Sequence, residues 1–291
     1  MLLVDASVYI FRAYHALPDS LRGRDEQPLN VVYGFADFLC GLIDHSQPGE
    51  IAVAFDESLE SSFRNERYPA YKANRETAPA DLKSQIRHCQ ALVKTLGICA
   101  LVSDRYEADD IIGTLATRAQ VPVTIVSSDK DLAQLLGAQD ILWDYARDLR
   151  YDPAAVEAKF GVRCDQIVDY LGLMGDAVDN IPGVPGIGAK TAAALLQSKQ
   201  TLDAIYADLD SVKTLPIRGA KGIAAKLEAG KDSAFMSREL SQIVTDVPLP
   251  ASADNLLRQP AKAQAISEFC DDLGIGSRLL QRLSALPEPA A

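Results

Sequence analysis

Histidine and paired cysteines are scarce in this chain of 291 residues. Its three histidines (His15, His45 and His88) have no ligand-like spacing, and its five cysteines include no C-x-x-C pair. An odd number of scattered cysteines favours reduced thiols over a disulfide framework or a zinc site. We therefore expect neither a histidine-based metal site nor disulfides, and we expect the chain to work in the cytoplasm.

Long apolar runs are also missing. No stretch reaches the roughly 18 residues that a membrane-spanning helix needs. The amino terminus goes directly into a strand-like run, without the regions of a signal peptide. With 48% hydrophobic and 24% charged residues, the composition is typical of a globular protein able to bury one large core or two coupled ones. No membrane contact is expected.

Basic residues are outnumbered, with 29 Lys and Arg against 40 Asp and Glu and a net charge of −11. This balance argues at first against nucleic acid, whose partners usually carry a basic footprint. Two segments differ: 61–90 has six basic and three acidic residues, and 183–231 has seven and four. Because solvated surface often shows such islands, they are weak evidence for a polyanionic ligand.

Short apolar runs alternate with segments of helical periodicity in the first half of the chain. Strands are predicted at 2–4, 51–55, 98–102, 123–126 and 141–143. Helices are predicted between them at 31–43, 81–96 and 109–119. This alternation is typical of a parallel, doubly wound α/β sheet. A polar, basic segment at about 57–80 is long for a connection, so we predict a functional loop or lid there.

The strand signal largely ends near residue 160. Short helices separated by Gly and Pro are predicted at 165–173, 190–197, 219–228 and 234–244, with two more at 261–273 and 276–286. We divide the chain into an α/β core (1–160), a helical module (161–250) and a C-terminal helical tail (251–291).

Acidic residues follow four of the predicted strands at the point where each strand ends. They are Asp5, Asp56, the group Glu107, Asp109 and Asp110, and the pair Asp129 and Asp131. In a parallel sheet these ends meet at the edge where ligands bind. Two carboxylates about 4 Å apart repel by roughly 4 kcal/mol at an effective dielectric near 20, so such a cluster needs cations or protons. Oxygen-only ligands favour Mg²⁺ or Mn²⁺, and paired ions suit phosphoryl displacement. Independent helix caps are the alternative interpretation.

Two further acidic residues, Asp176 and Asp179, lie in the helical module. Their spacing of three predicts one face of a helical turn, from which both can reach the same cluster. A solvated acidic turn is the alternative.

A glycine-rich turn from Ile181 to Thr191 leads into an apolar helix. Glycines allow a backbone to approach closely, and the amides at a helix start can bind a phosphate oxygen. This pattern resembles a helix–hairpin–helix clamp, which contacts only the DNA backbone. A plain turn is the alternative, and a nucleotide P-loop is excluded because its Gly-Lys-Ser/Thr ending is absent. The predicted DNA contacts are Gly183, Gly186, Ile187, Gly188, Ala189, Lys190 and Thr191.

In this order, the motifs resemble those of the bacterial 5′-nuclease (flap endonuclease) family, which includes the amino-terminal nuclease domain of DNA polymerase I. The resemblance covers roughly residues 1–250. It rests on Leu3-Val4-Asp5 with Arg12 to Ala16, Ala54-Phe55-Asp56, Tyr71-Lys72 with Arg75, Glu107 to Asp110, Asp129 to Asp131, Gly175 to Gly183 and Arg218 to Lys221. It implies a PIN-like, FEN-type fold with a helical arch at about 57–80 and a helix–three-turn–helix module. No polymerase domain follows, so a stand-alone member is expected.

The resemblance also implies roles for single residues. The carboxylates would hold two Mg²⁺ ions, for which Mn²⁺ can substitute: Asp5, Asp56, Glu107, Asp109 and Asp110 match the first group, and Asp129, Asp131, Asp176 and Asp179 match the second. Lys72 and Arg75 would neutralise the scissile phosphate, and Arg12 would contact DNA nearby. Further DNA contacts would come from Arg218 and Lys221. Backbone carbonyls of Leu173, Met174, Pro182, Val184 and Ile187 would hold a K⁺ ion.

We therefore expect a 5′-3′ exonuclease and flap endonuclease that acts on DNA with a 5′ flap, a nick or a free 5′ end. It would be associated with the nucleoid and recruited by replication or repair proteins. Bound metal would invert the sign of the acidic cluster that meets DNA. Two alternatives stay open, a ribonuclease on a similar acidic sheet and a DNA-junction binding protein without turnover.

Overall fold

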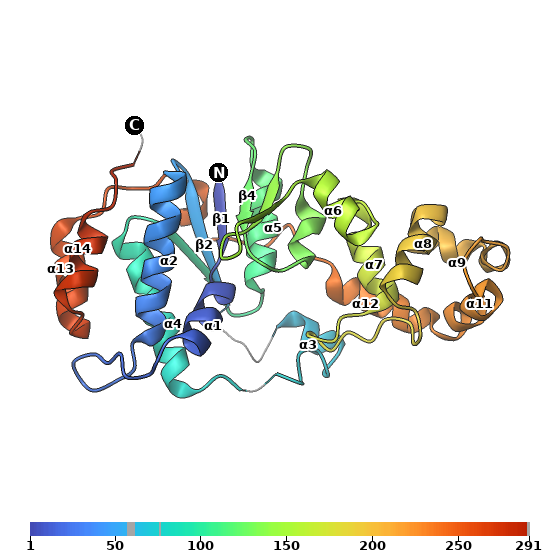
Figure 1. Ribbon diagram of the computed structural model, residues 1–291, viewed down its shortest axis with the longest axis horizontal. Coiled ribbons are helices and arrows are strands. Elements are labelled where there is room, and N and C mark those ends of the chain that lie inside the picture. Colours follow the sequence, from blue (N-terminus) through green and yellow to red (C-terminus); the bar gives the residue numbers. More distant parts are fainter. Residues whose placement is uncertain (57–61, 76, 290–291) are drawn as a thin grey trace.

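The computed structural model describes residues 1–56, 62–75 and 77–289. Figure 1 shows an elongated molecule with an α/β domain at one side and a helical module at the other. Across the described part of the chain, no helix combines the length and the apolar character needed to span a membrane.

A six-stranded sheet forms the centre of the first domain. Its order is β3-β2-β1-β4-β5-β6. Five strands are parallel: β1 (Leu2–Asp5), β2 (Ile51–Asp56), β3 (Cys99–Ser103), β4 (Thr124–Val126) and β5 (Ile141–Asp144). The predicted α/β fold is thus confirmed. The sheet is not purely parallel, however, because a short sixth strand, β6 (Leu149–Tyr151), pairs antiparallel with β5. Its three residues are largely exposed and lack an apolar run, so no pattern indicated them.

The parallel strands are covered on both faces, as their apolar runs predict. Leu2 and Val4 pack on one face with α2 (Asn30–Ser46) and α4 (Ala80–Thr95). Leu3 packs on the other face with α5 (Ala108–Arg118). Helix α1 (Ala6–Ala16), which was not predicted, begins directly after β1 with Asp5 as its N-cap. The carboxyl end of β1 therefore coincides with a helix start.

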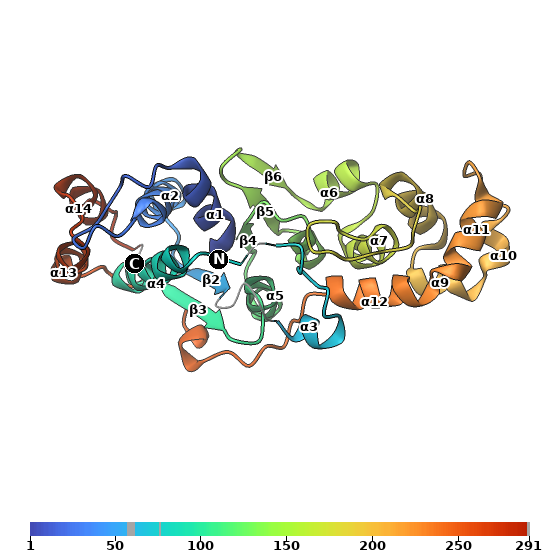
Figure 2. The ribbon, with the colours of Figure 1, turned by 90° about the horizontal axis from the view of Figure 1, so that it is seen from below.

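The helical module follows β6 through α6 (Pro153–Phe160). It contains α7 (Ile167–Met174), α8 (Ala189–Lys199), α9 (Leu202–Ala207), α10 (Leu209–Val212), α11 (Ala220–Ala229) and α12 (Lys231–Ser241). Figure 2 shows α7 and α12 running beside each other toward the sheet. One hydrophobic cluster continues from α5 into the module, so the module and one sheet face share a core.

The C-terminal tail returns to the first domain. After a 3₁₀ turn at Ala251–Asp254, its backbone bonds to the amino ends of the strands: Ile51 N donates to Leu256 O at 2.9 Å, and Gln259 N donates to Gly97 O at 2.8 Å. Helices α13 (Ala263–Leu273) and α14 (Ser277–Ser284) then pack on the α2 and α4 side, at the end of the molecule opposite the module (Figure 1).

Candidate active site at the carboxyl edge of the sheet

The strand ends bring acidic side chains from distant parts of the sequence into one cavity. The cavity has a volume of about 160 Å³ and also contains Lys72 and Arg75. Five of the nine predicted metal ligands line it: Asp5, Asp56, Glu107, Asp109 and Asp129. The carboxyl edge of the sheet therefore gathers an oxygen-rich site, as the positions of these residues after β1, β2, β3 and β4 predict.

Hydrogen bonds from two serines orient the first carboxylates. Ser7 Oγ donates to Asp56 Oδ2 at 2.6 Å, and Ser127 Oγ donates to Asp5 Oδ2 at 2.8 Å. The backbone N–H of Ala108, at the start of α5, donates to Asp56 Oδ1 at 2.8 Å. Ser7 and Ser127 were not among the predicted site residues, since a serine beside an acidic residue is too common to stand out.

Burial and mutual repulsion make these carboxylates hard to ionise without a cation. Burial, followed by the charge of Asp56, raises the pKa of Asp5 to about 7. Burial together with Asp129 raises the pKa of Asp131 to about 8, and the same two causes raise the pKa of Asp109 well above its ordinary value. Each such shift is a free-energy cost of the charged form, which a bound cation removes.

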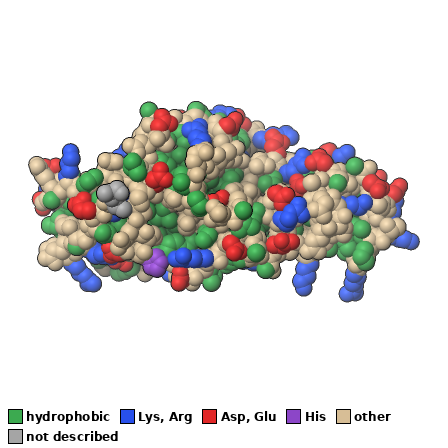
Figure 3. All heavy atoms as spheres, turned by 90° about the horizontal axis from the view of Figure 1, so that it is seen from above, with side chains coloured by type: hydrophobic (Ala, Val, Ile, Leu, Met, Phe, Trp, Pro, Cys, Tyr) green, Lys and Arg blue, Asp and Glu red, His purple; other side chains and the backbone are tan. Residues whose placement is uncertain are grey.

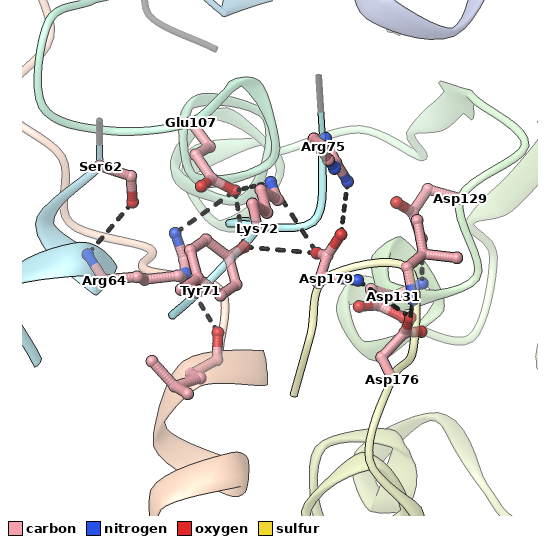
Figure 4. Close-up of polar contacts among 12 residues, drawn as sticks. Ser62, Arg64, Tyr71, Lys72, Arg75, Glu107, Asp129, Asp131, Asp176 and Asp179 are labelled. Atoms are coloured by element: carbon pink, nitrogen blue, oxygen red, sulfur yellow. Dashed lines mark hydrogen bonds and ion pairs between the residues drawn. The ribbon is translucent and has the colours of Figure 1, made fainter. Parts of the chain in front are cut away.

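The second predicted group is divided between two places. Asp131 opens a 3₁₀ helix, η1 (Asp131–Leu135), and its N–H donates to Asp129 Oδ1 at 2.9 Å. Asp176 and Asp179 do not lie on a helical turn: Asp176 and Ile181 exchange backbone hydrogen bonds across a tight turn. Asp176 Oδ1 accepts the N–H of Val178 at 2.7 Å, which bends the chain. Asp176 consequently faces Lys130. Asp179 faces Arg75, as Figure 4 shows.

Basic side chains from the predicted arch lie on the carboxylates. Lys72 Nζ is 2.7 Å from Glu107 Oε2 and 3.8 Å from Asp179 Oδ2. Arg75 is paired with Asp179, and Tyr71 OH donates to Glu107 Oε2 at 3.1 Å (Figure 4). Burial lowers the pKa of Lys72, but the negative charges around it, with Glu107 first and Asp179 and Asp56 among the others, together outweigh burial and raise the pKa well above normal. Lys72 therefore stays cationic beside the cavity.

The arch segment is docked on the turn of the helical module. Lys72 N donates to Asp179 O at 2.9 Å, and Asn180 Nδ2 donates to Ala70 O at 2.6 Å. Of the predicted arch at 57–80, residues 57–61 and 76 lie outside the described residues. In the described part before α4, the helix is confined to α3 (Phe63–Arg67). Tyr71 is buried against Ile181, so its ring packs within this contact.

Asp110 departs from its predicted place. Its carboxylate does not line the cavity, is fully buried, and forms an ion pair with Arg64 at 2.8 Å. These contacts argue against its assignment as a metal ligand. Sequence reasoning also missed Arg64 and Lys130, because their partners Asp110 and Asp176 are each 46 residues away along the chain.

The remaining donor set fits a hydrated hard cation. Among the described residues, no three His, Cys, Asp or Glu side chains are already drawn together as the ligands of one ion. Mg²⁺ does not need such a cage, because it keeps several waters and binds through one or two carboxylates. The buried Oδ1 of Asp131 accepts no hydrogen bond, and its nearest cationic partner, Lys130 Nζ, lies 3.4 Å away, so this oxygen lacks a close ligand. We conclude that the residues present fit a divalent metal.

The glycine turn before α8 has the close backbone approach that its sequence predicts. Gly183 has φ +60°, and a Cβ there would lie 2.3 Å from Gly175 N. Gly183 is nevertheless buried, and Ile187 is only 4% exposed. Neither residue therefore offers a surface to DNA. The exposed predicted contacts are Gly186, Gly188, Ala189 and Lys190, with Arg218 and Lys221 at the start of α11. Figure 3 shows basic side chains projecting from this module.

The K⁺ site and the DNA contact of Arg12 both stay predictions. The five carbonyls assigned to K⁺ lie at the end of α7 and in the turn before α8, where Leu173 O already accepts Val184 N at 2.8 Å. Arg12 is exposed on α1 and lines a separate cavity of about 270 Å³ with Tyr9 and Phe38. The structure does not bring it to the carboxylates, so its contact with DNA stays a prediction.

Comparison with known proteins then decides the family. Residues 1–161 match the family model described as 5′-3′ exonuclease, N-terminal resolvase-like domain. Residues 162–264 match 5′-3′ exonuclease, C-terminal SAM fold. The chain belongs to the 5′-3′ exonuclease family. The resemblance seen in the sequence motifs is confirmed, and with it the identification as a nuclease.

Relatives of this 5′-3′ exonuclease include longer enzymes. DNA polymerase I of Pseudomonas aeruginosa is 43% identical over 270 residues, which are 91% of this chain and 29% of the polymerase. DNA polymerase I of Bacillus subtilis is 36% identical over 291 residues, which are 97% of this chain and 32% of the polymerase. The chain therefore spans about a third of the length of these relatives.

Solved structures share the fold. T5 D15 protein co-crystallised with metal ions has a TM-score of 0.68 at 20% identity, covering 97% of this chain and 96% of that one. T5 5′-exonuclease with bound divalent metal ions (zinc) has a TM-score of 0.67 at 20% identity, covering 98% and 96%. The catalytic core of Rad2 in complex with DNA substrate has a TM-score of 0.64 at 16% identity, covering 98% and 92%. These likenesses show that the chain has the fold of those proteins, whose structures contain metal ions or DNA.

Proposed function

We propose that this 5′-3′ exonuclease also acts as a flap endonuclease, hydrolysing DNA phosphodiesters near 5′ ends or flap junctions with two Mg²⁺ ions. The observation that carries the proposal is the cavity at the carboxyl edge of the sheet. It combines buried carboxylates whose pKa values are raised with a lysine that stays charged. Such a site recruits divalent cations and then a phosphate.

The carboxylates would hold the ions in two neighbouring positions. Asp5, Asp56, Glu107 and Asp109 would form the first, and Asp129, Asp131, Asp176 and Asp179 the second. Divalent ions bound there supply a nucleophilic water at neutral pH and stabilise the leaving oxygen. The serines that bond to Asp5 and Asp56 hold those carboxylates in place before the ions arrive. Preorganisation of this kind reduces the reorganisation needed during the reaction.

Lys72 and Arg75 would exchange partners during substrate binding. They neutralise Glu107 and Asp179 in the absence of metal. With divalent ions bound to those carboxylates, Lys72 and Arg75 would be released to the scissile phosphate, where negative charge grows in the transition state. Because Lys72 bonds to Asp179 O through its own backbone N–H, and Arg75 follows three residues later, this exchange also couples the arch to the helical module.

The helical module would grip the duplex through its backbone phosphates. The exposed start of α8 carries Lys190, and the start of α11 carries Lys221 next to Arg218. Helix starts and lysines bind phosphate without reading bases, which suits an enzyme that recognises DNA structure. We include in the proposal a K⁺ ion held by carbonyls of the turn between α7 and α8.

We also propose a setting for this activity. Because the relatives are DNA polymerases, we place the enzyme in replication and repair, close to the nucleoid in the cytoplasm, with recruiting proteins of those processes as partners.

Cleavage of a 5′-end-labelled DNA flap by wild type and Asp129→Ala, with Mg²⁺ and with EDTA, tests the proposal. We expect metal-dependent cutting near the junction, lost in the variant while DNA binding persists. Tight binding without cutting in Mg²⁺ or Mn²⁺ would instead indicate a junction-binding protein. Efficient cutting of an all-RNA substrate in parallel would indicate a ribonuclease.

A further inference from the structure

The carboxylate of Asp110 has no acceptor site left for a metal. Its Oδ1 accepts Arg64 Nη2 at 2.8 Å and the N–H of Val244 at 2.9 Å. Its Oδ2 accepts Arg64 Nη1 at 2.8 Å and the N–H of Glu107 at 3.1 Å. A carboxylate offers about four lone-pair sites, and these four bonds occupy them. The adjacent Asp109, in contrast, lines the cavity.

Arg64 is satisfied just as fully on its own side. It bonds twice to Asp110, while Nε donates to Leu240 O at 2.8 Å and Nη2 to Gln242 O at 2.9 Å. Its Nη1 also lies 3.8 Å from Glu107 Oε2 (Figure 4). The side chain is 4% exposed, so the guanidinium is buried with a partner in each direction. Only arginine offers this planar fork of five N–H donors.

These bonds join three parts of the molecule at one point. Arg64 belongs to α3, at the base of the segment that carries Lys72. Asp110 belongs to the first turn of α5 and bonds to the backbone of Glu107, the residue that Lys72 contacts. The two carbonyls come from the end of α12, whose Ser237 Oγ accepts the N–H of Gly183 at 2.9 Å. The same contact point therefore connects the cavity, the arch segment and the DNA-binding turn.

We propose that Arg64 and Asp110 are a positioning pair, which acts through Glu107 and Lys72 and binds no metal itself. The inference rests on the proposed function, since it assigns to Asp110 a task within that reaction other than metal binding. By fixing the backbone of Glu107 and the base of the arch segment together, the pair sets how Lys72 and the carboxylates face each other. Its loss changes the rate of cleavage and leaves metal affinity almost intact.

A set of four variants tests this proposal: Asp110→Asn, Arg64→Lys, the double variant, and Asp109→Asn as the matched ligand control. Thermal unfolding first checks that each variant is folded under the assay conditions. Mn²⁺ binding to the metal-free protein is measured by calorimetry, and kcat and KM are measured on a 5′-flap DNA in Mg²⁺.

We expect Asp109→Asn to lose at least tenfold in Mn²⁺ affinity, and Asp110→Asn to stay within threefold of wild type. Asp110→Asn and Arg64→Lys should each lower kcat at least tenfold with KM changed less than threefold. The double variant should be no slower than the slower single variant, because the two residues act as one unit.

Three results would overturn the positioning pair. They are a tenfold loss of Mn²⁺ affinity in Asp110→Asn, wild-type kcat in both single variants, or multiplying losses in the double variant. Where a variant does not fold, crystals of the wild type soaked in Mn²⁺ decide the point. An anomalous peak within coordination distance of Asp110 refutes the proposal, and a peak at Asp109 with none at Asp110 supports it. Wild-type Mn²⁺ affinity in Asp109→Asn would instead overturn the metal site of the proposed function, while the kcat comparison still decides the pair.

Discussion

Without metal, the stability of this 5′-3′ exonuclease is expected to fall as the pH rises. The pKa of Asp5 is raised to about 7 by burial and by Asp56, and the pKa of Asp131 is raised to about 8 by burial and by Asp129. Above pH 4 the folded protein therefore keeps protons that the unfolded chain has released. The free energy of unfolding consequently decreases with pH until the folded-state values near 7 and 8 are passed.

The magnitude follows from Asp5 alone. It titrates about three pH units above its ordinary value of 3.8, which corresponds to roughly 4 kcal/mol at 1.36 kcal/mol per unit. Asp131 interacts with the same cluster through Asp129, so its effect is not added. For 291 residues, an unfolding entropy of about 0.6 kcal/mol per kelvin converts this into a decrease of roughly 7 °C in Tm between pH 4 and 7, of which about two thirds falls above pH 5.

Calorimetry at pH 5, 6, 7 and 8, in EDTA and in MgCl₂, measures this directly. Mg²⁺ binds the deprotonated carboxylates, so the increase in Tm that it produces should grow with pH. Asp5→Asn should flatten the profile in EDTA. His88, whose pKa is lowered by burial, acts in the opposite direction, and His88→Gln corrects for it. A Tm in EDTA that is constant or rises from pH 5 to 8 would refute the reasoning, as would an equal Mg²⁺ effect at pH 5 and 8.

Three further predictions concern catalysis, DNA binding and the backbone. Lys72→Ala should lower kcat on a 5′-flap DNA about 10²-fold. The control Arg67→Ala changes a residue of the same segment that pairs with Glu239 outside the cavity, and its kcat should stay within threefold of wild type. Equal losses of kcat in the two variants would contradict the role of Lys72. Lys190→Ala should weaken DNA binding for all sequences and reduce the slope of log affinity against log salt by about 1, which filter binding at several salt concentrations measures. Gly183→Ala should lower the free energy of unfolding in urea by about 1–3 kcal/mol or more, because the new Cβ would lie 2.3 Å from Gly175 N at a φ of +60°. An unchanged urea midpoint would count against the turn geometry.

Local patterns in the sequence were sufficient to predict the sheet, its acidic edge and the glycine turn. A buried parallel strand is a short apolar run, and an acidic residue after it is necessarily near the carboxyl edge, so Asp5, Asp56 and Asp129 were placed without a structure. The turn before α8 could be predicted equally well, because the close backbone approach at Gly183, where a Cβ would lie 2.3 Å from Gly175 N, requires glycine.

Contacts between segments far apart in the sequence could not be predicted from such local patterns. Asp109 and Asp110 are adjacent on a helix and point about 100° apart, so one can face the cavity while the other cannot. Which of them does so depends on Arg64, 46 residues away from Asp110, and on the end of α12. The motif therefore determined that carboxylates gather at this edge, and the tertiary structure decided which of them remain free to bind a cation.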